Sequence, residues 1–277
     1  FLITYLLVDE KRKNGQINLK KFWIRRILRI WPLFYLCVFF GFYMFPFLKT
    51  LLGQTTNETA TFINYITFTN NFDLIKNGLP DASVLGVLWS VAIEEQFYLI
   101  WPIILFCLPI KKHWVAFISV ISISLIFRSL NNTYSMHETH TISCISDMAI
   151  GSFGAWLISE KSVFRNQIIN LTKFKIGLIY TLFLLIFLFR DELLYSFYII
   201  RIFERPFIAV IIILIILEQC YSKNSLFKLS KFRIISKLGT ITYGLYCLHF
   251  IGILITINLT KKLAFNTELW QVLIFET

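Results

Sequence analysis

Long apolar runs recur along almost the whole chain and leave it few ways to fold. A membrane span needs about 20 mostly apolar residues. In lipid the backbone must also satisfy its own hydrogen bonds, which favours helices. The shorter runs therefore need flanking residues, and their boundaries are defined to within about four residues. The sequence predicts an all-α fold, a polytopic membrane helix bundle with seven complete spans: Ile30–Phe47, Leu88–Pro109, Trp114–Phe127, Ile142–Leu157, Ile176–Phe189, Phe197–Leu217 and Ile241–Leu259.

Partial spans are expected at both ends of the chain. Phe1–Val8 is interpreted as the tail of an earlier span, because an apolar run of that length with no cap or charge rarely starts a protein. An eighth span begins near Leu269. The chain is therefore expected to be a fragment, incomplete at both ends. Residues 1–277 are predicted to form a single membrane domain, because no repeat, low-complexity tract or hydrophilic domain interrupts them.

The composition agrees with a membrane protein. Hydrophobic residues make up 57% of the chain and charged residues 16%, whereas globular domains carry about 25% charged residues. Phe alone supplies 29 of the 277 residues. These values exclude a soluble enzyme, a disordered chain and a collagen-like chain. The five cysteines stand singly without CxxC spacing, so neither a disulfide framework nor a metal site is predicted.

The net charge of +11 is explained mostly by topology. On one side of the predicted spans, the connecting segments hold 19 Lys and Arg residues, and on the other side they hold 6. Arg201 and Arg205 lie inside a span. Because cytoplasmic loops are enriched in Lys and Arg, the basic side is predicted to be cytoplasmic. The lipid bilayer is thus an expected partner and nucleic acid is not.

A polar stripe opens the second predicted span at its outer end. Ser90, Glu94 and Tyr98 are spaced by four and share one helical face, next to Trp89. Glu95 lies on a different face of the helix, with Val91 and Leu99. Glu94 could accept or orient a proton, although a carboxylate this close to the interface could equally remain hydrated. Spacing alone leaves the two interpretations open.

Three arginines enter the first predicted span from the basic side. Arg26 and Arg29 lie on one side of the helix, and Arg25 shares a face with Arg29. Forked guanidinium groups so placed could bind phosphate oxygens. Taken alone, the block is more typical of an orientation signal that also contacts anionic lipid.

Other polar residues inside the spans need partners. Asp147 would be costly in a membrane without one, so an Arg or a polar network is expected beside it, in a structural role. Thr242, Tyr246 and His249 share a face of the last complete span. The cluster formed by Arg201, Glu204 and Arg205 could bind a polar substrate or pair internally. Outside the spans, the piece from 62 to 68 is too short to cross and is expected to lie at the interface or to re-enter the membrane.

Four blocks occur in a recognisable order: Phe1-Leu2-Ile3-Thr4 with Glu10 and the segment from Phe22 to Pro32; Trp89-Ser90 through Glu94-Glu95-Gln96-Phe97-Tyr98 to Trp101-Pro102; Asp147 with Gly151; and Leu238-Gly239 through Thr242-Tyr243-Gly244-Leu245-Tyr246 to His249. Together they resemble acyltransferase family 3, the bacterial integral membrane O-acyltransferases that act on surface polysaccharides. The resemblance covers nearly the whole chain.

The resemblance implies an O-acetyltransferase of the cell inner (plasma) membrane. It would move an acyl group, most simply acetyl, from acyl-CoA in the cytoplasm to a hydroxyl of an envelope glycan or its lipid-linked precursor. Acetyl-CoA is then a donor substrate, with no bound cofactor. The implied catalytic residues are Glu94, Tyr98 and His249; Arg25, Arg26 and Arg29 would bind the donor, and Trp89 and Ser90 the acceptor.

The chain departs from the family pattern in two places. The family's first membrane segment carries a His regarded as the catalytic base, and this chain is expected to begin after that segment. The Arg often found two residues before the equivalent of Asp147 is Ile145 here. Two other classes stay open from the residues: a transporter or flippase, whose intramembrane acids and His would form a substrate path, and a structural subunit of an envelope assembly. The oligomeric state is not predicted.

Overall fold

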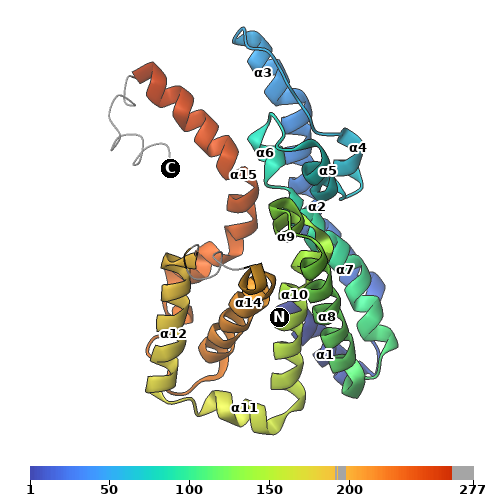
Figure 1. Cartoon of the computed structure of the whole chain (residues 1–277), viewed down its shortest axis with the longest axis vertical. Helices are drawn as coiled ribbons and strands as arrows, with labels where there is room; N and C mark the ends of the chain where they lie inside the picture. Colours follow the sequence, from blue (N-terminus) through green and yellow to red (C-terminus); the bar gives the residue numbers. More distant parts are fainter. Residues whose placement is uncertain (191, 193–197, 264–277) are drawn as a thin grey trace. The chain divides into compact units, whose positions relative to one another are not determined.

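The structure is a computed structural model, and it describes residues 1–190, 192 and 198–263. Its elements are all helices, with no strand among those residues (Figure 1). The chain divides into two compact units, which are described separately. Unit 1 comprises Phe1–Ile24 and Ile93–Arg233, and unit 2 comprises Arg25–Ala92 and Ile234–Thr277. That the whole chain is one domain stays a prediction.

Most of the described helices follow one another closely along the chain, and a longer segment separates α3 from α4. Their bounds are α1 Leu2–Asn14, α2 Leu19–Phe39, the π-helical η1 Phe40–Met44, α3 Phe45–Leu51, α4 Phe62–Ile66, α5 Asn70–Asn77, α6 Ser83–Gly86, α7 Trp89–Cys107, η2 Ile110–Lys112, α8 His113–Leu130, α9 Tyr134–Thr139, α10 Thr141–Glu160, α11 Ser162–Ile169, α12 Lys173–Leu188, α14 Tyr198–Tyr221, η3 Leu229–Lys231 and α15 Arg233–Leu263.

Five stretches of the described chain are long and apolar enough to cross a membrane: Leu19–Leu51, Ser83–Cys107, Ile110–Leu130, Tyr134–Glu160 and Arg233–Thr260. They coincide with the first four predicted spans and the last one. The predicted class, an all-helical chain with several candidate membrane helices, is therefore confirmed.

The count of seven complete spans is not confirmed. Where Ile176–Phe189 was predicted, α12 has 16 residues and meets α11 at a bend of 88°. Where Phe197–Leu217 was predicted, α14 is long, but its first two turns carry Arg201, Glu204 and Arg205. At the chain ends, Phe1–Val8 belongs to a helix that continues to Asn14, and the run near Leu269 lies outside the described residues.

Unit 1 is a bundle built around α10, which packs against α1, α8 and α14. The approach of α10 to α14 depends on Gly154, since a Cβ there would stand 2.5 Å from Cγ1 of Ile213. A buried aromatic cluster that includes Trp101, Phe117 and Trp156 fills the space between α7, α8 and α10. These contacts bring helices from distant parts of the chain into one core.

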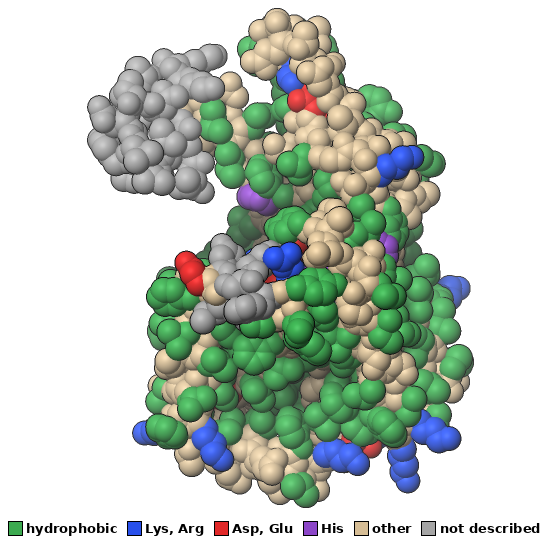
Figure 2. All heavy atoms as spheres, in the orientation of Figure 1, with side chains coloured by type: hydrophobic (Ala, Val, Ile, Leu, Met, Phe, Trp, Pro, Cys, Tyr) green, Lys and Arg blue, Asp and Glu red, His purple; other side chains and the backbone are tan. Residues whose placement is uncertain are grey.

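The basic connections of unit 1 meet at one end of its bundle. Lys11 of α1 donates to the carbonyls of Leu105, Phe106 and Leu108 at the end of α7, each across 2.7 Å. Arg12 pairs with Glu160 at the end of α10. Figure 2 shows Lys and Arg side chains along the lower rim of this unit, beneath a broad hydrophobic surface. The Lys and Arg residues that the sequence places on one side of the predicted spans therefore lie together at one end of unit 1.

In unit 2, the segment after α3 folds back beside the helix that precedes it. Lys49 pairs with Asp81 at 2.8 Å near the end of α3, and the ring of Phe42 lies 5.2 Å from that of Tyr65. Phe68 lies 4.5 Å from Phe34, centroid to centroid. From residue 49 to residue 34 a helix rises about 22 Å. Residues 62 to 68 therefore pack along the side of the first candidate membrane helix, and both predicted alternatives for them remain predictions.

The polar groups of the segment from 57 to 81 bond with one another. Asp73 accepts hydrogen bonds from the backbone N–H of Thr61 at 2.8 Å and from the side-chain amides of Asn64 and Asn77 at 2.7 and 2.9 Å. Non-helical backbone is tolerated at membrane depth only where such groups are satisfied within the protein or line a cavity. The network around Asp73 meets that requirement for this segment.

Candidate functional site

An ionic cluster occupies the end of unit 1 opposite its basic rim. Arg205 of α14 binds Asp147 of α10 through two nitrogens, Nε at 3.0 Å and Nη2 at 2.7 Å. Its Nη1 contacts a carboxylate oxygen of Glu138 at 3.2 Å. The expectation that Asp147 has an Arg partner is confirmed. The partner comes from another helix, α14.

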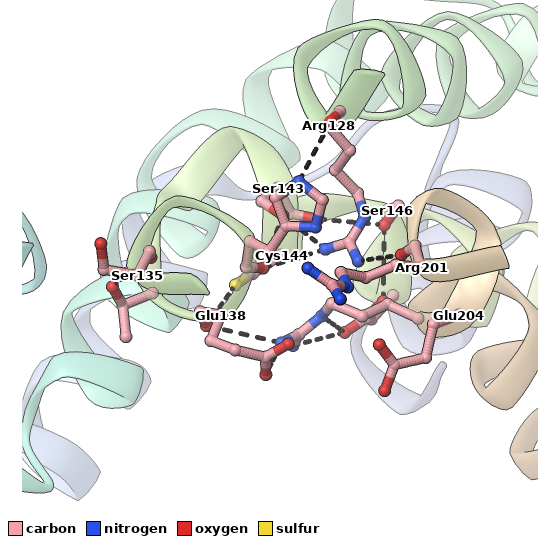
Figure 3. Close-up of polar contacts among 12 residues, drawn as sticks. Arg128, Ser135, Glu138, Ser143, Cys144, Ser146, Arg201 and Glu204 are labelled. Atoms are coloured by element: carbon pink, nitrogen blue, oxygen red, sulfur yellow. Dashed lines mark hydrogen bonds and ion pairs between the residues drawn. The ribbon is translucent and has the colours of Figure 1, made fainter. Parts of the chain in front are cut away.

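A second arginine extends the cluster. Arg190, which follows α12, contacts the buried carboxylate of Glu204 at 2.5 Å and that of Glu138 at 3.7 Å. Glu138 thus lies between two arginines. These contacts tie the segment that follows α12 to α9 and α14. Figure 3 labels Glu138 and Glu204 of this cluster. Of the predicted Arg201–Glu204–Arg205 group, two members therefore pair with residues outside it.

Arg128 lies fully buried near these pairs, and its guanidinium group donates hydrogen bonds to neutral acceptors (Figure 3). Its Nε donates to the carbonyl of Ile202 at 2.9 Å and its Nη2 to that of Arg201 at 2.6 Å. Its Nη1 donates to the Ser143 hydroxyl at 2.7 Å and to the His137 carbonyl at 2.9 Å. Arg128 therefore anchors the start of α14 to α8, α9 and α10.

A cavity of about 380 Å³ opens beside the ionic cluster in unit 1. It is lined by the charged residues Asp147, Arg190 and Arg205, by isoleucines and Ala209 of α14, by Gly151 of α10 and by Phe1. A pocket with an apolar wall and a few convergent polar groups is the usual form of a small-molecule site. Among the described residues, no group of three His, Cys, Asp or Glu side chains could hold a metal ion.

The polar stripe of α7 forms as predicted. The helix is continuous from Trp89 to Cys107, and the hydroxyl of Tyr98 donates to Oε2 of Glu94 at 3.0 Å. Glu94 is exposed, whereas Glu95 is half-buried. A carboxylate that accepts a bond from a phenol one turn away has a restricted orientation, which suits it to position a proton or a hydroxyl.

The backbone carbonyl of Tyr98 also accepts a hydrogen bond from another helix. Pro102 lacks an N–H and so leaves the carbonyl of Tyr98, four residues earlier, without its helical partner. The indole Nε1 of Trp23 on α2 donates to that carbonyl at 3.0 Å. Pro206 and Ile202 stand in the same relation on α14, where Arg128 is the donor.

In unit 2, two motif blocks that lie far apart in the sequence meet. The hydroxyl groups of Ser90 and Tyr246 are 2.5 Å apart, and Tyr246 donates to the carbonyl of Val87 at 2.8 Å. One turn earlier on α15, Tyr243 donates to the carbonyl of Ile30 on α2 at 2.9 Å. The predicted acceptor residue Ser90 is thus joined to the last motif.

The remaining predicted residues are placed as follows. His249 is exposed on α15, where its Nδ1 contacts the carbonyl of Tyr246. Arg25 and Arg29 are exposed on α2 and Arg26 is half-buried. Trp89 is half-buried at the start of α7.

The sequence analysis did not identify three residues that take part in the ionic cluster or pack beside it: Arg128, Glu138 and Arg190. The sequence places these residues in or beside connecting segments, where charged side chains are normally hydrated. One signal was nonetheless present in the sequence. Pro206 lies inside an apolar run and cannot donate a backbone hydrogen bond, so the carbonyl four residues earlier needs a donor from elsewhere in the protein.

Comparison with known proteins places the chain in a family. Residues 1–275 match the family model described as "Acyltransferase domain". The peptidoglycan O-acetyltransferase OatA of Listeria monocytogenes is 27% identical over 277 aligned residues, which cover 90% of this chain and 42% of that protein. The Bacillus subtilis protein YrhL, provisionally named a peptidoglycan O-acetyltransferase, is 26% identical over 275 residues, with 90% and 42% covered.

A Staphylococcus aureus (strain COL) protein that is provisionally named an O-acetyltransferase is 29% identical over 274 residues, covering 90% of this chain and 43% of that protein. The chain thus spans about two fifths of the length of these relatives. No solved structure matches it. Since the family model covers nearly every residue, and its motif blocks form the contacts described above, the chain belongs to this acyltransferase family.

Proposed function

We propose that the intact protein is a membrane-bound O-acetyltransferase that moves an acetyl group from acyl-CoA to a hydroxyl of peptidoglycan or of another envelope glycan. The family match over residues 1–275 carries this proposal. The acetyl group and the peptidoglycan acceptor are suggested by the name of the Listeria relative. Because the chain covers only part of such relatives, the activity is proposed for the whole protein.

In the proposed reaction, the acceptor hydroxyl oxygen attacks the thioester carbonyl carbon. The bond between that carbon and sulfur breaks, and the CoA thiolate leaves and is protonated by the proton that the hydroxyl loses. By family resemblance the base is a His that lies outside this chain. Glu94 is assigned the role of orienting the acceptor hydroxyl or that His. The hydrogen bond from the Tyr98 hydroxyl at 3.0 Å fixes the position of the Glu94 carboxylate.

The acceptor side is assigned to unit 2. Trp89 could stack on a sugar ring, and the linked hydroxyl groups of Ser90 and Tyr246 could bond to sugar hydroxyls. His249 lies one turn beyond Tyr246 and is exposed, so it is available to a polar substrate. The linked pair is the feature that favours this assignment, since it joins two of the family's motif blocks.

The donor is assigned to Arg25, Arg26 and Arg29. Guanidinium groups bind phosphate oxygens through paired hydrogen bonds, and CoA carries several phosphates. The exposure of Arg25 and Arg29 agrees with a role toward a diffusible ligand.

Seven complete spans in the inner (plasma) membrane, with the basic end of unit 1 in the cytoplasm, complete the proposal. The gathering of basic connections at one end of unit 1 supports this orientation. Single-cysteine labelling with an impermeant reagent, in a cysteine-free background, tests it. We expect labelling at position 57 of intact cells and none at position 11; the reverse pattern would overturn the orientation.

The activity is tested with membranes that contain the full-length protein, supplied with acetyl-CoA with and without purified peptidoglycan. We expect free CoA to be released, and the glycan to gain acetate, only when both substrates are present. Membranes with the Glu94→Gln variant at equal abundance serve as the control. Transport of glycan without CoA release would favour the transporter alternative instead.

A further inference from the structure

Two tyrosines of α15 contact the two proposed substrate sites within unit 2. Tyr243 donates to the carbonyl of Ile30 on α2 at 2.9 Å, and Ile30 directly follows Arg29. Tyr246 donates to the carbonyl of Val87 at 2.8 Å, just before the start of α7. Three residues of α-helix rise about 4.5 Å and turn about 300°. The two rings therefore diverge on α15, so that one reaches the donor helix and the other reaches the acceptor residues.

A further contact holds α15 against α2. The thiol of Cys37 on α2 donates to the carbonyl of Cys247 on α15 at 3.6 Å, and both cysteines are fully buried. Cys247 lies about one helical turn beyond Tyr243, and Cys37 lies about two turns beyond Ile30. The two helices therefore meet at two successive levels, and a movement of one along the other would break both contacts.

The hydroxyl of Tyr243 is not needed to satisfy the backbone of α2. In a helix the carbonyl of Ile30 accepts from the N–H of Phe34, and that N–H is present. Pro32 instead removes the donor for the carbonyl of Leu28. Ile30 thus differs from the two carbonyls that prolines release on α7 and α14. The bond from Tyr243 is an additional one, and its removal leaves no buried acceptor without a donor.

We propose that Tyr243 is a positioning residue for acyl transfer, whose hydrogen bond fixes the spacing between the donor arginines of α2 and the acceptor pair of Ser90 and Tyr246. This inference rests on the proposed function, which supplies the two substrate sites. Spacing matters because a misplacement of about 1 Å between reacting groups can cost about a hundredfold in rate. Tyr243 is assigned no contact with either substrate, and it acts through the position of α15 relative to α2.

The test is steady-state kinetics of the purified full-length protein in proteoliposomes, with acetyl-CoA and soluble peptidoglycan fragments as substrates. Tyr243→Phe should lower kcat about tenfold or more. The Kd for acetyl-CoA and the KM for peptidoglycan should change little, since the residues assigned to each substrate are intact. The stoichiometry of acetyl-CoA binding counts the folded molecules, so a smaller folded fraction is not mistaken for a lower kcat. A kcat equal to that of the parent, or a loss matched by the stoichiometry, would overturn the proposal.

Two further variants isolate the hydrogen bond. Tyr243→p-aminophenylalanine keeps the ring and an N–H donor at the same place, so it should recover most of the kcat that Tyr243→Phe loses. Tyr198→Phe is the matched control, because it removes a bond of 2.7 Å from a phenol to the carbonyl of Ser129 in unit 1, and its kcat should equal that of the parent.

The remaining outcomes also decide the matter. A Tyr243→Phe protein that fails to accumulate would show that the bond holds the fold itself, and the positioning role would be wrong. No recovery in the p-aminophenylalanine variant, or an equal loss in Tyr198→Phe, would count against it in the same way. An inactive parent protein would refute the proposed function and this inference with it, whereas an active parent with an unaffected Tyr243→Phe refutes the inference alone.

Discussion

The guanidinium Nε of Arg128 donates to the carbonyl of Ile202, and Ile202 lies four residues before Pro206. The proline ring removes the N–H that would normally bond this carbonyl. An unsatisfied carbonyl in an apolar interior costs about 1–3 kcal/mol. Arg128 thus supplies, from another helix, the donor that α14 lacks. On α7 the indole of Trp23 does the same for the carbonyl that Pro102 releases.

This relationship predicts a specific energetic coupling. Arg128→Met should destabilise the full-length protein, and the loss should be smaller in a Pro206→Ala background, where residue 206 can bond Ile202 within the helix. We expect a coupling free energy of about 1 kcal/mol, measured by thermal unfolding in detergent. Pro102→Ala should couple to Trp23→Phe but not to Arg128→Met. Coupling of Arg128→Met to both prolines alike would contradict the explanation.

The adjacent acids of α7 should differ in what they control. Glu94 is exposed and bonded to Tyr98, whereas Glu95 is half-buried. Glu94→Gln should therefore remove most glycan acetylation without lowering the amount of inserted protein, and Tyr98→Phe should remove part of it. Glu95→Gln should act mainly on stability. Acetylation per unit of membrane protein, measured beside thermal stability, separates the two effects. A fully active Glu94→Gln would take Glu94 out of the mechanism.

The arginines of α2 should set the affinity for the donor. Arg26→Ala or Arg29→Ala should weaken acyl-CoA binding by about 1.5–3 kcal/mol, the contribution of a charge-assisted bond. Arg→Lys should restore only part of it, because an ammonium group cannot form a bidentate fork. Calorimetric titration of the purified protein measures this, with Lys20→Ala as the control. Unchanged affinity in both alanine variants would leave these residues as orientation signals.

Acid should loosen the segment from 57 to 81 through Asp81. Burial alone would raise the pKa of this carboxyl, but the hydrogen bonds from Lys49 and from the N–H of Asn57, together with the charge of Lys49, lower it below its ordinary value of 3.8. The pair therefore stabilises the fold fully above that ordinary pKa. Its contribution is lost as pH falls through the lower folded-state value.

We expect the protection of residues 57 to 81 against hydrogen exchange, taken relative to the intrinsic rate at each pH, to fall in acid, below about pH 4. Lys49→Met should weaken this pH dependence and raise exchange already at neutral pH. Because Glu58 and Asp73 also accept bonds in this segment, the difference between the two proteins is the decisive quantity. A Lys49→Met variant that exchanges like the parent at every pH would contradict the role of the pair.

Periodicity was enough to predict most of the helices. Apolar runs place the span that begins near Leu88 and the polar stripe of Glu94 and Tyr98, because both depend only on residues close in sequence. The need for a partner at Asp147 also followed from the sequence, since the cost of a charge in lipid is independent of the fold. The identity of that partner did not, because Arg205 is reached only through the packing of α14 on α10.

Hydropathy and periodicity do not determine which surfaces become covered. His249 shares a face with Tyr246, yet a shared face says nothing of which neighbour covers it. The span count treated α14 as a simple crossing, although its charged residues are held by Arg190 and Asp147 from other helices. Contacts of this kind depend on tertiary packing and leave little trace in hydropathy.

The two carbonyls that prolines release also bear on how the protein is made. A chain is synthesised from its N-terminus, and in both cases the donor comes first. Trp23 precedes Tyr98 by 75 residues, and Arg128 precedes Ile202 by 74. Each of these two proline-containing helices is therefore made after its donor, so the carbonyl without a helical partner has a donor already present. A permuted gene that placed α7 ahead of α2 would allow the same final contacts but would expose that carbonyl to lipid during insertion.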